Sequence, residues 1–303
     1  MNTSRSTWFL ALMVVSGGIA GCARPIEQTA VRVAPVTRLQ ARQSNFSQTE
    51  LARIDRNCPL GRPKLDATFD FGPTRFVIRE GYVLQHSSKD KIPLWVCEGI
   101  TPAQLSGALT RADAFQADPD LPAGERAELA DYKKSGYDRG HMAPAGDQTT
   151  DGRLKRETFY LSNMAPQKPQ LNQQIWAALE AKARQWLSQR GGGYIITGGL
   201  FYDPDEENPA KADGLITHDE IGPDKVAVPT HFYKIVASKD SAGRWEAIAF
   251  VMENHGYPRP FDFTGFERSI DWVEAHAGID FMPDLDAGEE PRVEGSVPAL
   301  WTP

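Results

Sequence analysis

Four consecutive residues near the middle of the chain, Asp138, Arg139, Gly140 and His141, place an acid, a base, a glycine and a histidine side by side. A histidine accepts a proton near neutral pH, and an arginine can hold a phosphate group through several donors. A glycine lets the backbone turn sharply or approach another group closely. These residue types suit acid–base chemistry on an anionic substrate, but on their own they also fit a surface Asp-Arg pair beside an ordinary histidine.

The segments that follow determine which other side chains could join His141. We predict a short apolar strand over residues 159–164, which carries Asn163 near its end. Apolar residues then recur at helical spacing over residues 175–187 and stop at a run of glycines, so this is the most regular helix that the sequence predicts. Asn172 lies at or near its first turn. A strand leading to His141 and a helix opening at Asn172 could bring these two side chains together.

A histidine and an asparagine in one place suit the chemistry of phosphate esters with a divalent ion. Magnesium prefers oxygen ligands and keeps several waters, so the amide oxygen of Asn172 can be enough protein when phosphate oxygens supply the rest. His141 could then take a proton from a water that attacks phosphorus. Glu180 follows Asn172 by eight residues, about two helical turns, and could hold water at the ion. Arg139 could stabilise phosphate charge.

This set of residues resembles the DNA/RNA non-specific endonucleases, the family that includes endonuclease G and the Serratia nuclease. The resemblance rests on the motif at 138–141, on Asn163, and on Asn172 and Glu180 at the family's spacing, and it covers about residues 65–285. It implies a ββα-metal finger set on a central antiparallel sheet. It also implies hydrolysis of the phosphodiester bonds of DNA and RNA to leave 5'-phosphate products.

The resemblance implies a role for each of the main side chains. His141 becomes the general base, and Asn172 becomes the sole direct protein ligand of Mg²⁺, for which Mn²⁺ could substitute. Asn163 and Glu180 would support the water shell of the metal and the substrate.

Three other residues take supporting roles. The family has a functional arginine upstream of the motif, and Arg111 is the candidate here for binding substrate, together with Arg139. We expect Asp138 to hold the loop rather than to bind metal, and Gly140 to be structural.

Antiparallel strands supply the frame in which these residues would lie. The sequence predicts a hairpin at 75–79 and 82–86, a third strand at 92–97, later strands at 194–201, 226–237 and 247–253, and a short helix at 269–277. No internal repeat and no clear linker interrupts residues 55–287, which we assign to one α+β domain with flanking helices.

Composition limits the function classes further. The chain has 303 residues, 41% of them hydrophobic, which is enough for a full core, and a formal charge of -7. This charge excludes nucleic-acid binding through a generally basic surface. An anionic substrate would have to meet a local cluster of cations or a metal ion.

The N-terminus has the features of an export signal. A positive residue, an apolar run over 8–15 and the sequence Ile-Ala-Gly-Cys ending at Cys22 predict a lipoprotein signal peptide over residues 1–21. Eight apolar residues are too few to span a bilayer. Lipidation at Cys22 would anchor the protein to a membrane of the bacterial cell envelope, with residues 22–54 as a flexible tether and 288–303 as a proline-containing tail.

The remaining two cysteines, Cys58 and Cys97, form an even pair in an oxidising compartment, so we predict a disulfide between them.

Three functions remain open at this point. The first is an envelope-tethered, magnesium-dependent nuclease that acts on DNA and RNA. The second is a non-catalytic nucleic-acid-binding module on the same scaffold, and the third is a metal phosphoesterase for small extracellular substrates, which the acidic net charge suits. Related enzymes are often dimers, so the resemblance also implies a homodimer.

Overall fold

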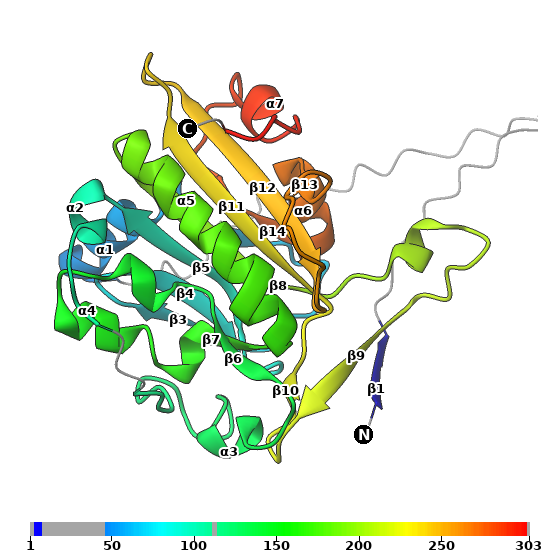
Figure 1. The fold of residues 1–303 in the computed structure, drawn as a ribbon. Helices are drawn as coiled ribbons and strands as arrows, with labels where there is room; N and C mark the ends of the chain where they lie inside the picture. The colour runs from blue at the N-terminus through cyan, green and yellow to red at the C-terminus, as the bar shows by residue number, and fades with distance from the viewer. Residues whose placement is uncertain (1–2, 8–45, 111–113, 302–303) are drawn as a thin grey trace, which may run out of the picture.

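A seven-stranded antiparallel sheet lies at the centre of the protein (Figure 1), in a computed structural model that describes residues 3–7, 46–110 and 114–301. Its strand order is β13-β12-β11-β8-β5-β4-β3. The strands are β3 (Thr74–Ile78), β4 (Val83–Ser87), β5 (Pro93–Ile100), β8 (Gly193–Leu200), β11 (His231–Lys239), β12 (Trp245–Glu253) and β13 (Glu267–Arg268). The predicted α+β class with a central antiparallel sheet is confirmed.

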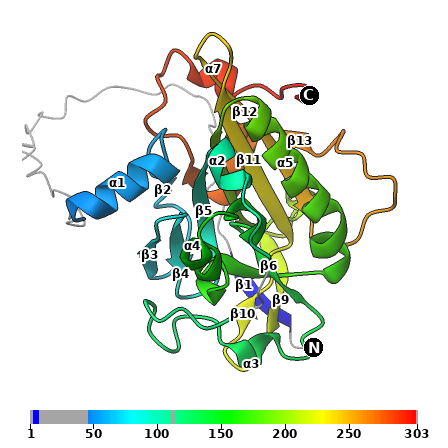
Figure 2. The ribbon, with the colours of Figure 1, turned by 60° about the vertical axis from the view of Figure 1, so that its left-hand side comes forward.

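Helices cover both faces of this sheet. Leu179 and Trp186 of α5 (Ala177–Gln189) pack on one face, while α1 (Gln48–Asn57) and α6 (Ile270–Ala277) pack on the other. Figure 2 shows α1 and α5 on opposite sides of the sheet. Because neither face meets water, β5 and β11 are buried along almost their whole length instead of alternating between buried and exposed residues.

A smaller ββα unit, whose helix continues into α5, lies on the face of the main sheet that α5 covers. Strand β6 (Asp138–His141) pairs antiparallel with β7 (Met164–Gln167), and a π-helical turn, η3 (Leu171–Trp176), leads directly into α5. This is the expected ββα finger. The strand predicted at 159–164 is wrong, however, because residues 161–163 form a 3-10 turn, η2 (Leu161–Asn163), and extended structure begins only at Met164.

The predicted boundaries of the domain also need correction. The tether assigned to residues 22–54 is wrong from Gln48 onward, because α1 begins there. Ser47 and Glu50 form a reciprocal capping box at its start, and Ile54 is buried against the sheet. The tail is part of the packed structure as well: the Trp186 indole N–H donates to the carbonyl oxygen of Trp301 at 2.7 Å.

Several sequence predictions fall outside the described residues. Cys22, Arg111 and most of the signal segment 1–21 belong to the ranges 1–2, 8–45, 111–113 and 302–303. Thr3–Thr7 forms a strand, β1, that pairs antiparallel with β9 (Leu215–Ile221), which the sequence analysis did not anticipate. In the part of the chain that the structure describes, no helix is both long and apolar enough to cross a membrane.

The other elements are short. They are β2 (Lys64–Leu65), α2 (Pro102–Leu105), α3 (Leu129–Tyr132), η1 (Ala145–Asp147), α4 (Gly152–Glu157), η4 (Pro204–Glu207), β10 (Val226–Ala227), β14 (Ile279–Asp280) and α7 (Glu290–Val293).

The two cysteines Cys58 and Cys97 are free, buried thiols in the structure, which corrects the predicted disulfide. Burial raises the pKa of the Cys97 thiol, and a hydrogen bond with Cys58 raises this pKa further. A raised pKa disfavours the thiolate through which disulfides form.

Candidate active site

A hydrogen bond joins the first residue of β6 to the first turn of the helix. The amide nitrogen of Asn172 donates to Oδ2 of Asp138 at 2.9 Å, and the amide nitrogen of Gln173 donates to the same oxygen at 2.7 Å. Since a carboxylate only accepts hydrogen bonds, the nitrogen end of the Asn172 amide faces Asp138 and its oxygen end is turned away. Asp138 thus fixes the orientation of the one side-chain oxygen that Asn172 could offer to a cation.

Arg139 and His141 lie on a common aromatic residue, Phe115. The Arg139 guanidinium lies 4.1 Å from the centre of the Phe115 ring, and the His141 ring centre lies 5.6 Å from it. Phe159 packs edge-on against His141 at 5.0 Å. Residues two apart on a strand share a face, so β6 presents Arg139 and His141 together. The sequence analysis missed Phe115, whose only signal was an aromatic residue in an otherwise polar, irregular segment.

Gly140 lies between these two residues and packs against β7. It pairs with Ala165, and a Cβ atom at this position would lie 2.0 Å from Oε1 of Gln167. Because Gln167 is itself fully buried, it has no room to move aside. Any side chain at Gly140 would push β6 away from β7, so the glycine is required by close packing.

Asn163 holds the backbone that follows His141. Its Oδ1 accepts from the Ala143 N–H at 2.9 Å, and its Nδ2 donates to the carbonyl oxygens of Ala143 and Thr158, each at 2.9 Å. The side chain is completely buried. Asn163 therefore positions the backbone after His141, and its expected place near the water shell of the metal stays a prediction.

The π-helical turn changes which helix residues share a face. In an ideal α-helix, eight residues rotate about 80° beyond two full turns. A π turn holds more residues per turn, so each residue rotates less. The turn η3 contains Asn172 and ends four residues before Glu180, so it reduces the rotation between these two side chains and moves them toward a common face of the helix.

Buried charges connect the helix to the loop after His141. Arg184 Nη1 lies 2.7 Å from Oδ1 of Asp147, whose side chain is 1% exposed. Asp147 comes six residues after His141, so this ion pair ties α5 to the His141 loop. The sequence analysis did not identify this ion pair.

A fully buried cation lies beneath the helix. Lys234 of β11 is fully buried, and its Nζ donates to Oγ1 of Thr197 at 2.7 Å. Burial lowers the pKa of Lys234, while the negative charges of Glu180 and Glu98 oppose this shift. Burial also raises the pKa of Glu98, and nearby Asp147 adds to that effect. A hydrophobic pattern does not reveal such residues, because they occupy core positions of otherwise apolar strands.

An open groove of about 330 Å³ begins beside the motif. Tyr137, which precedes β6, lies at its edge, and the Lys168 ammonium lies 3.9 Å from the centre of the Tyr137 ring. The backbone N–H of Lys168 donates to Oδ1 of Asn254 at 2.8 Å, which fixes this segment. The groove thus presents a cation and an aromatic ring next to Asp138, together with the carboxylates of Asp219 and Glu253.

The residues present fit a magnesium ion better than a metal held by many side chains. Within the described ranges, no group of three or more His, Cys, Asp and Glu side chains could hold a metal ion. Mg²⁺ needs few protein ligands when waters and phosphate oxygens complete its shell. The fixed oxygen of Asn172 meets that requirement.

A finger of two antiparallel strands and a helix, with a histidine ending the first strand and a held asparagine opening the helix, defines a ββα-metal nuclease. Residues 67–288 match a model of the family described as DNA/RNA non-specific endonuclease. The chain belongs to this family and is a hydrolytic, metal-dependent endonuclease.

Individual relatives support the same assignment. Human mitochondrial endonuclease G is 36% identical over 208 residues, covering 68% of this chain and 69% of its own length. Nuclease C1 of Cunninghamella echinulata is 36% identical over 218 residues, covering 70% of this chain and 84% of its own length. A crystal structure of an EndoG/EndoGI complex, in which EndoG is inhibited, has a TM-score of 0.68 and 32% identity, covering 77% of this chain and 93% of that chain.

Proposed function

We propose that this protein hydrolyses DNA and RNA with Mg²⁺ held at Asn172 and with His141 as the general base, leaving 5'-phosphate products. The observation that carries the proposal is the hydrogen bond from Asn172 to Asp138. It turns the amide oxygen of Asn172 outward at the start of the strand that ends in His141.

His141 and Arg139 of β6 have different roles in the reaction. His141, packed between Phe115 and Phe159, takes a proton from the water that attacks phosphorus. The bond between phosphorus and the 3'-oxygen breaks, and the leaving oxygen takes up a proton from water. Arg139 on the same face stabilises the charge that develops on the phosphate. Bound Mg²⁺ would supply Lewis-acid stabilisation of the phosphate oxygens. Glu180, on the helix face shared with Asn172, holds water in place at the site.

Local cations offset the acidic net charge of the chain at the substrate. Arg139 and Lys168 flank Asp138 along the finger, and Lys168 lies in the open groove beside it. The groove also holds Asp219 and Glu253, so Arg139 and Lys168 are the groups that would contact the nucleic-acid backbone, and the Tyr137 ring could stack on a base without sequence preference.

Digestion of supercoiled plasmid and of structured RNA tests this function. We expect both to be cleaved with Mg²⁺, cleavage to stop with chelator and return when Mg²⁺ is added back, and the products to accept ligation through 5'-phosphates. Cleavage that persists in chelator would contradict the metal role. Hydrolysis of small phosphodiesters without cleavage of either polymer would instead favour the small-substrate phosphoesterase.

We also propose that lipidation at Cys22 tethers the enzyme to the cell envelope, on the grounds of the Ile-Ala-Gly-Cys sequence after an apolar run. Wild type should incorporate labelled fatty acid and fractionate with membranes, and Cys22→Ala should do neither. Equal labelling of both proteins would rule out this site.

Light scattering on the detergent-free Cys22→Ala protein would test the expected homodimer.

A further inference from the structure

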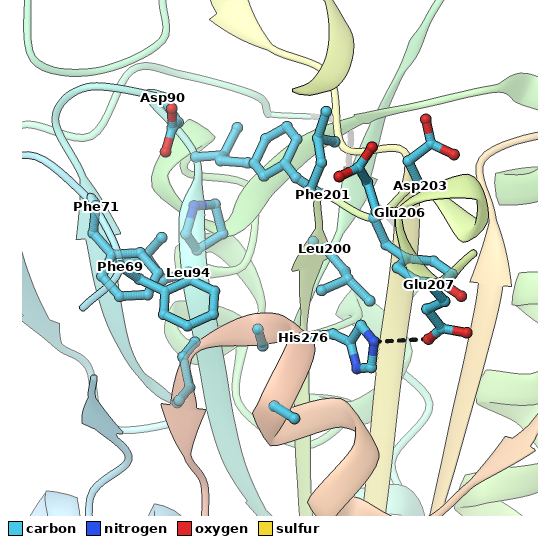
Figure 3. A pocket seen from close by; sticks show the side chains of 18 residues that line it. Phe69, Phe71, Asp90, Leu94, Leu200, Phe201, Asp203, Glu206, Glu207 and His276 are labelled. Carbon is cyan, nitrogen blue, oxygen red and sulfur yellow. Dashed lines mark hydrogen bonds and ion pairs between the residues drawn. The ribbon is translucent and has the colours of Figure 1, made fainter. Parts of the chain in front are cut away.

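A second cavity, of about 280 Å³, lies apart from the catalytic finger. Figure 3 shows it between the turn that joins β4 and β5, the end of β8, the 3-10 turn η4 and the C-terminal end of α6. Its walls are largely apolar, and two of its rings, Phe69 and Phe71, stack on each other with centres 5.9 Å apart. Leu94, Leu200 and Phe201 form the adjacent wall (Figure 3).

The cavity lies away from the catalytic finger. Leu94, Leu200 and Ile279 belong to the core that packs under α1 and α6, whereas Ile92 and Phe201 pack with the core that contains α5. None of the residues assigned to catalysis or metal binding lines the cavity. A ligand bound there would therefore be distinct from the phosphodiester at the active site.

One side of the cavity is strongly acidic. Among its eighteen lining residues, all within the described chain, none is lysine or arginine, and four carry carboxylates, namely Asp90, Asp203, Glu206 and Glu207. Figure 3 shows the last three gathered on one side, facing the phenylalanine rings across the cavity. The one titratable base, His276, lies 3.0 Å from Glu207 through its Nε2 atom.

Neutral donors fix two of these carboxylates in place. Oδ1 of Asp203 accepts from the Asp205 N–H at 2.9 Å. The two oxygens of Glu206 accept from the N–H groups of Asp213, at 2.9 Å, and Gly214, at 3.0 Å. Backbone donors orient a carboxylate without cancelling its charge, so the acidic side is both preorganised and negative.

The phenol of Tyr202, which also lines the cavity, responds to this environment. Burial raises the pKa of Tyr202 to about 12, Glu207 and Asp203 contribute to the rise, and Arg268 opposes it. A phosphate or carboxylate ligand would meet the same repulsion, whereas a cation would be attracted.

We propose that this cavity binds an organic cation with an apolar body, such as an aromatic amine. The apolar body would lie against Phe69, Phe71 and Leu200, where its burial is favourable. Its ammonium group would then face Asp203 and Glu206 across the cavity. Cations are also attracted to aromatic faces, so the stacked phenylalanines add to the preference. The cavity volume suits a ligand of one or two rings.

Three probes of matched shape test the proposal on the whole protein. Tryptamine is a cation, indole-3-ethanol is neutral and indole-3-acetate is an anion, and all three carry the same indole. By isothermal titration calorimetry we expect saturable binding of tryptamine that is about tenfold or more tighter than binding of either of the others. Equal affinity for the three probes, or no saturable tryptamine binding up to about 1 mM, would overturn the proposal.

Variants of residues that line the cavity test whether tryptamine binds there. Glu206→Gln and Asp203→Asn should each weaken tryptamine binding several-fold, and Ile216→Trp should block the cavity. Asp205→Asn is the matched control, because Asp205 lies on the same turn but pairs with Lys211 at 2.7 Å and does not line the cavity. Plasmid cleavage by each variant confirms that it is folded. Binding unchanged in folded Ile216→Trp and Glu206→Gln would place the amine elsewhere and refute this site.

Discussion

Oδ2 of Asp138 accepts hydrogen bonds from the side-chain amides of both Asn172 and Gln173, so one carboxylate oxygen joins β6 to the first turn of the catalytic helix. An asparagine amide can be turned either way at little cost unless a neighbour distinguishes its oxygen from its nitrogen. Asp138 makes this distinction, and the resulting direction of the Asn172 oxygen is what makes it a usable ligand.

Asp138→Ala should therefore weaken metal binding more than folding. Loss of a partner that orients a metal ligand commonly costs about 10–100-fold in metal affinity or activity. We expect the Mg²⁺ concentration for half-maximal cleavage to rise by that order, while circular dichroism stays unchanged. The Mg²⁺ requirement of Asp138→Asn should lie between those of wild type and Asp138→Ala, since the amide oxygen of asparagine still accepts one hydrogen bond. An unaltered Mg²⁺ titration for Asp138→Ala would show that the orientation of Asn172 is set elsewhere.

His141→Ala should lower the rate of plasmid cleavage by about 10²–10⁴-fold, the usual contribution of a general base. The melting temperature should change little, because His141 is only partly buried. Added imidazole should restore part of the activity if the missing group is a base. A variant that cleaves at the wild-type rate would remove His141 from the mechanism.

Phe115→Leu tests the aromatic contact that Arg139 and His141 share. A cation over an aromatic ring contributes about 0.5–2 kcal/mol, so we expect cleavage to slow by up to about 30-fold. Phe263→Leu is the control, since Phe263 packs against Phe250 on the main sheet and touches neither residue of the motif. Equal rates for the two variants would mean that Phe115 fills space without positioning the site.

Arg184→Met should destabilise the protein, because it leaves the buried carboxylate of Asp147 without its partner. Breaking a fully buried pair on one side costs about 3–5 kcal/mol, and we expect a smaller loss here because the Arg184 side chain is 27% exposed. Urea denaturation measures this loss, and the double variant Arg184→Met with Asp147→Asn should recover part of it. If the single variant is as stable as wild type, the pair does not hold α5 to the His141 loop.

His86 should make stability depend on pH below neutrality. Burial lowers the pKa of His86 from 6.5 to about 4, so the folded state resists a proton that the unfolded state takes up. The stability present above pH 6.5 is therefore lost as the pH falls toward 4, by about 3 kcal/mol at most. We expect wild type to lose this much more than His86→Gln between pH 7 and 4 in urea denaturation. Parallel losses in both proteins would exclude His86 as the cause.

The sequence anticipated the sheet and the principal elements of the finger. The β3–β4 hairpin, β5, β8, β12, α5 and α6 all follow from local apolar patterns and turn residues, since these patterns act over a few neighbouring positions. The capping box of Ser47 and Glu50 is also a local pattern, and it marks the start of α1.

The two cysteines show where this reasoning fails. Their number indicated a covalent pair, but the structure holds both as free, buried thiols. For Asn163, residue type indicated a polar group near the metal, and only the structure shows its burial and its backbone partners. Such contacts depend on how the chain returns on itself.

By itself, the sequence determined the family, the motif at 138–141 and the spacing of Asn172 and Glu180. Only the tertiary structure decided that Asp138 orients Asn172 and that Phe115 lies under both Arg139 and His141. It also decided that a π turn moves Glu180 toward the helix face of Asn172. The physical reason is that these relationships are contacts between segments separated by tens of residues or deviations from ideal helix geometry, and neither leaves a local pattern in the chain.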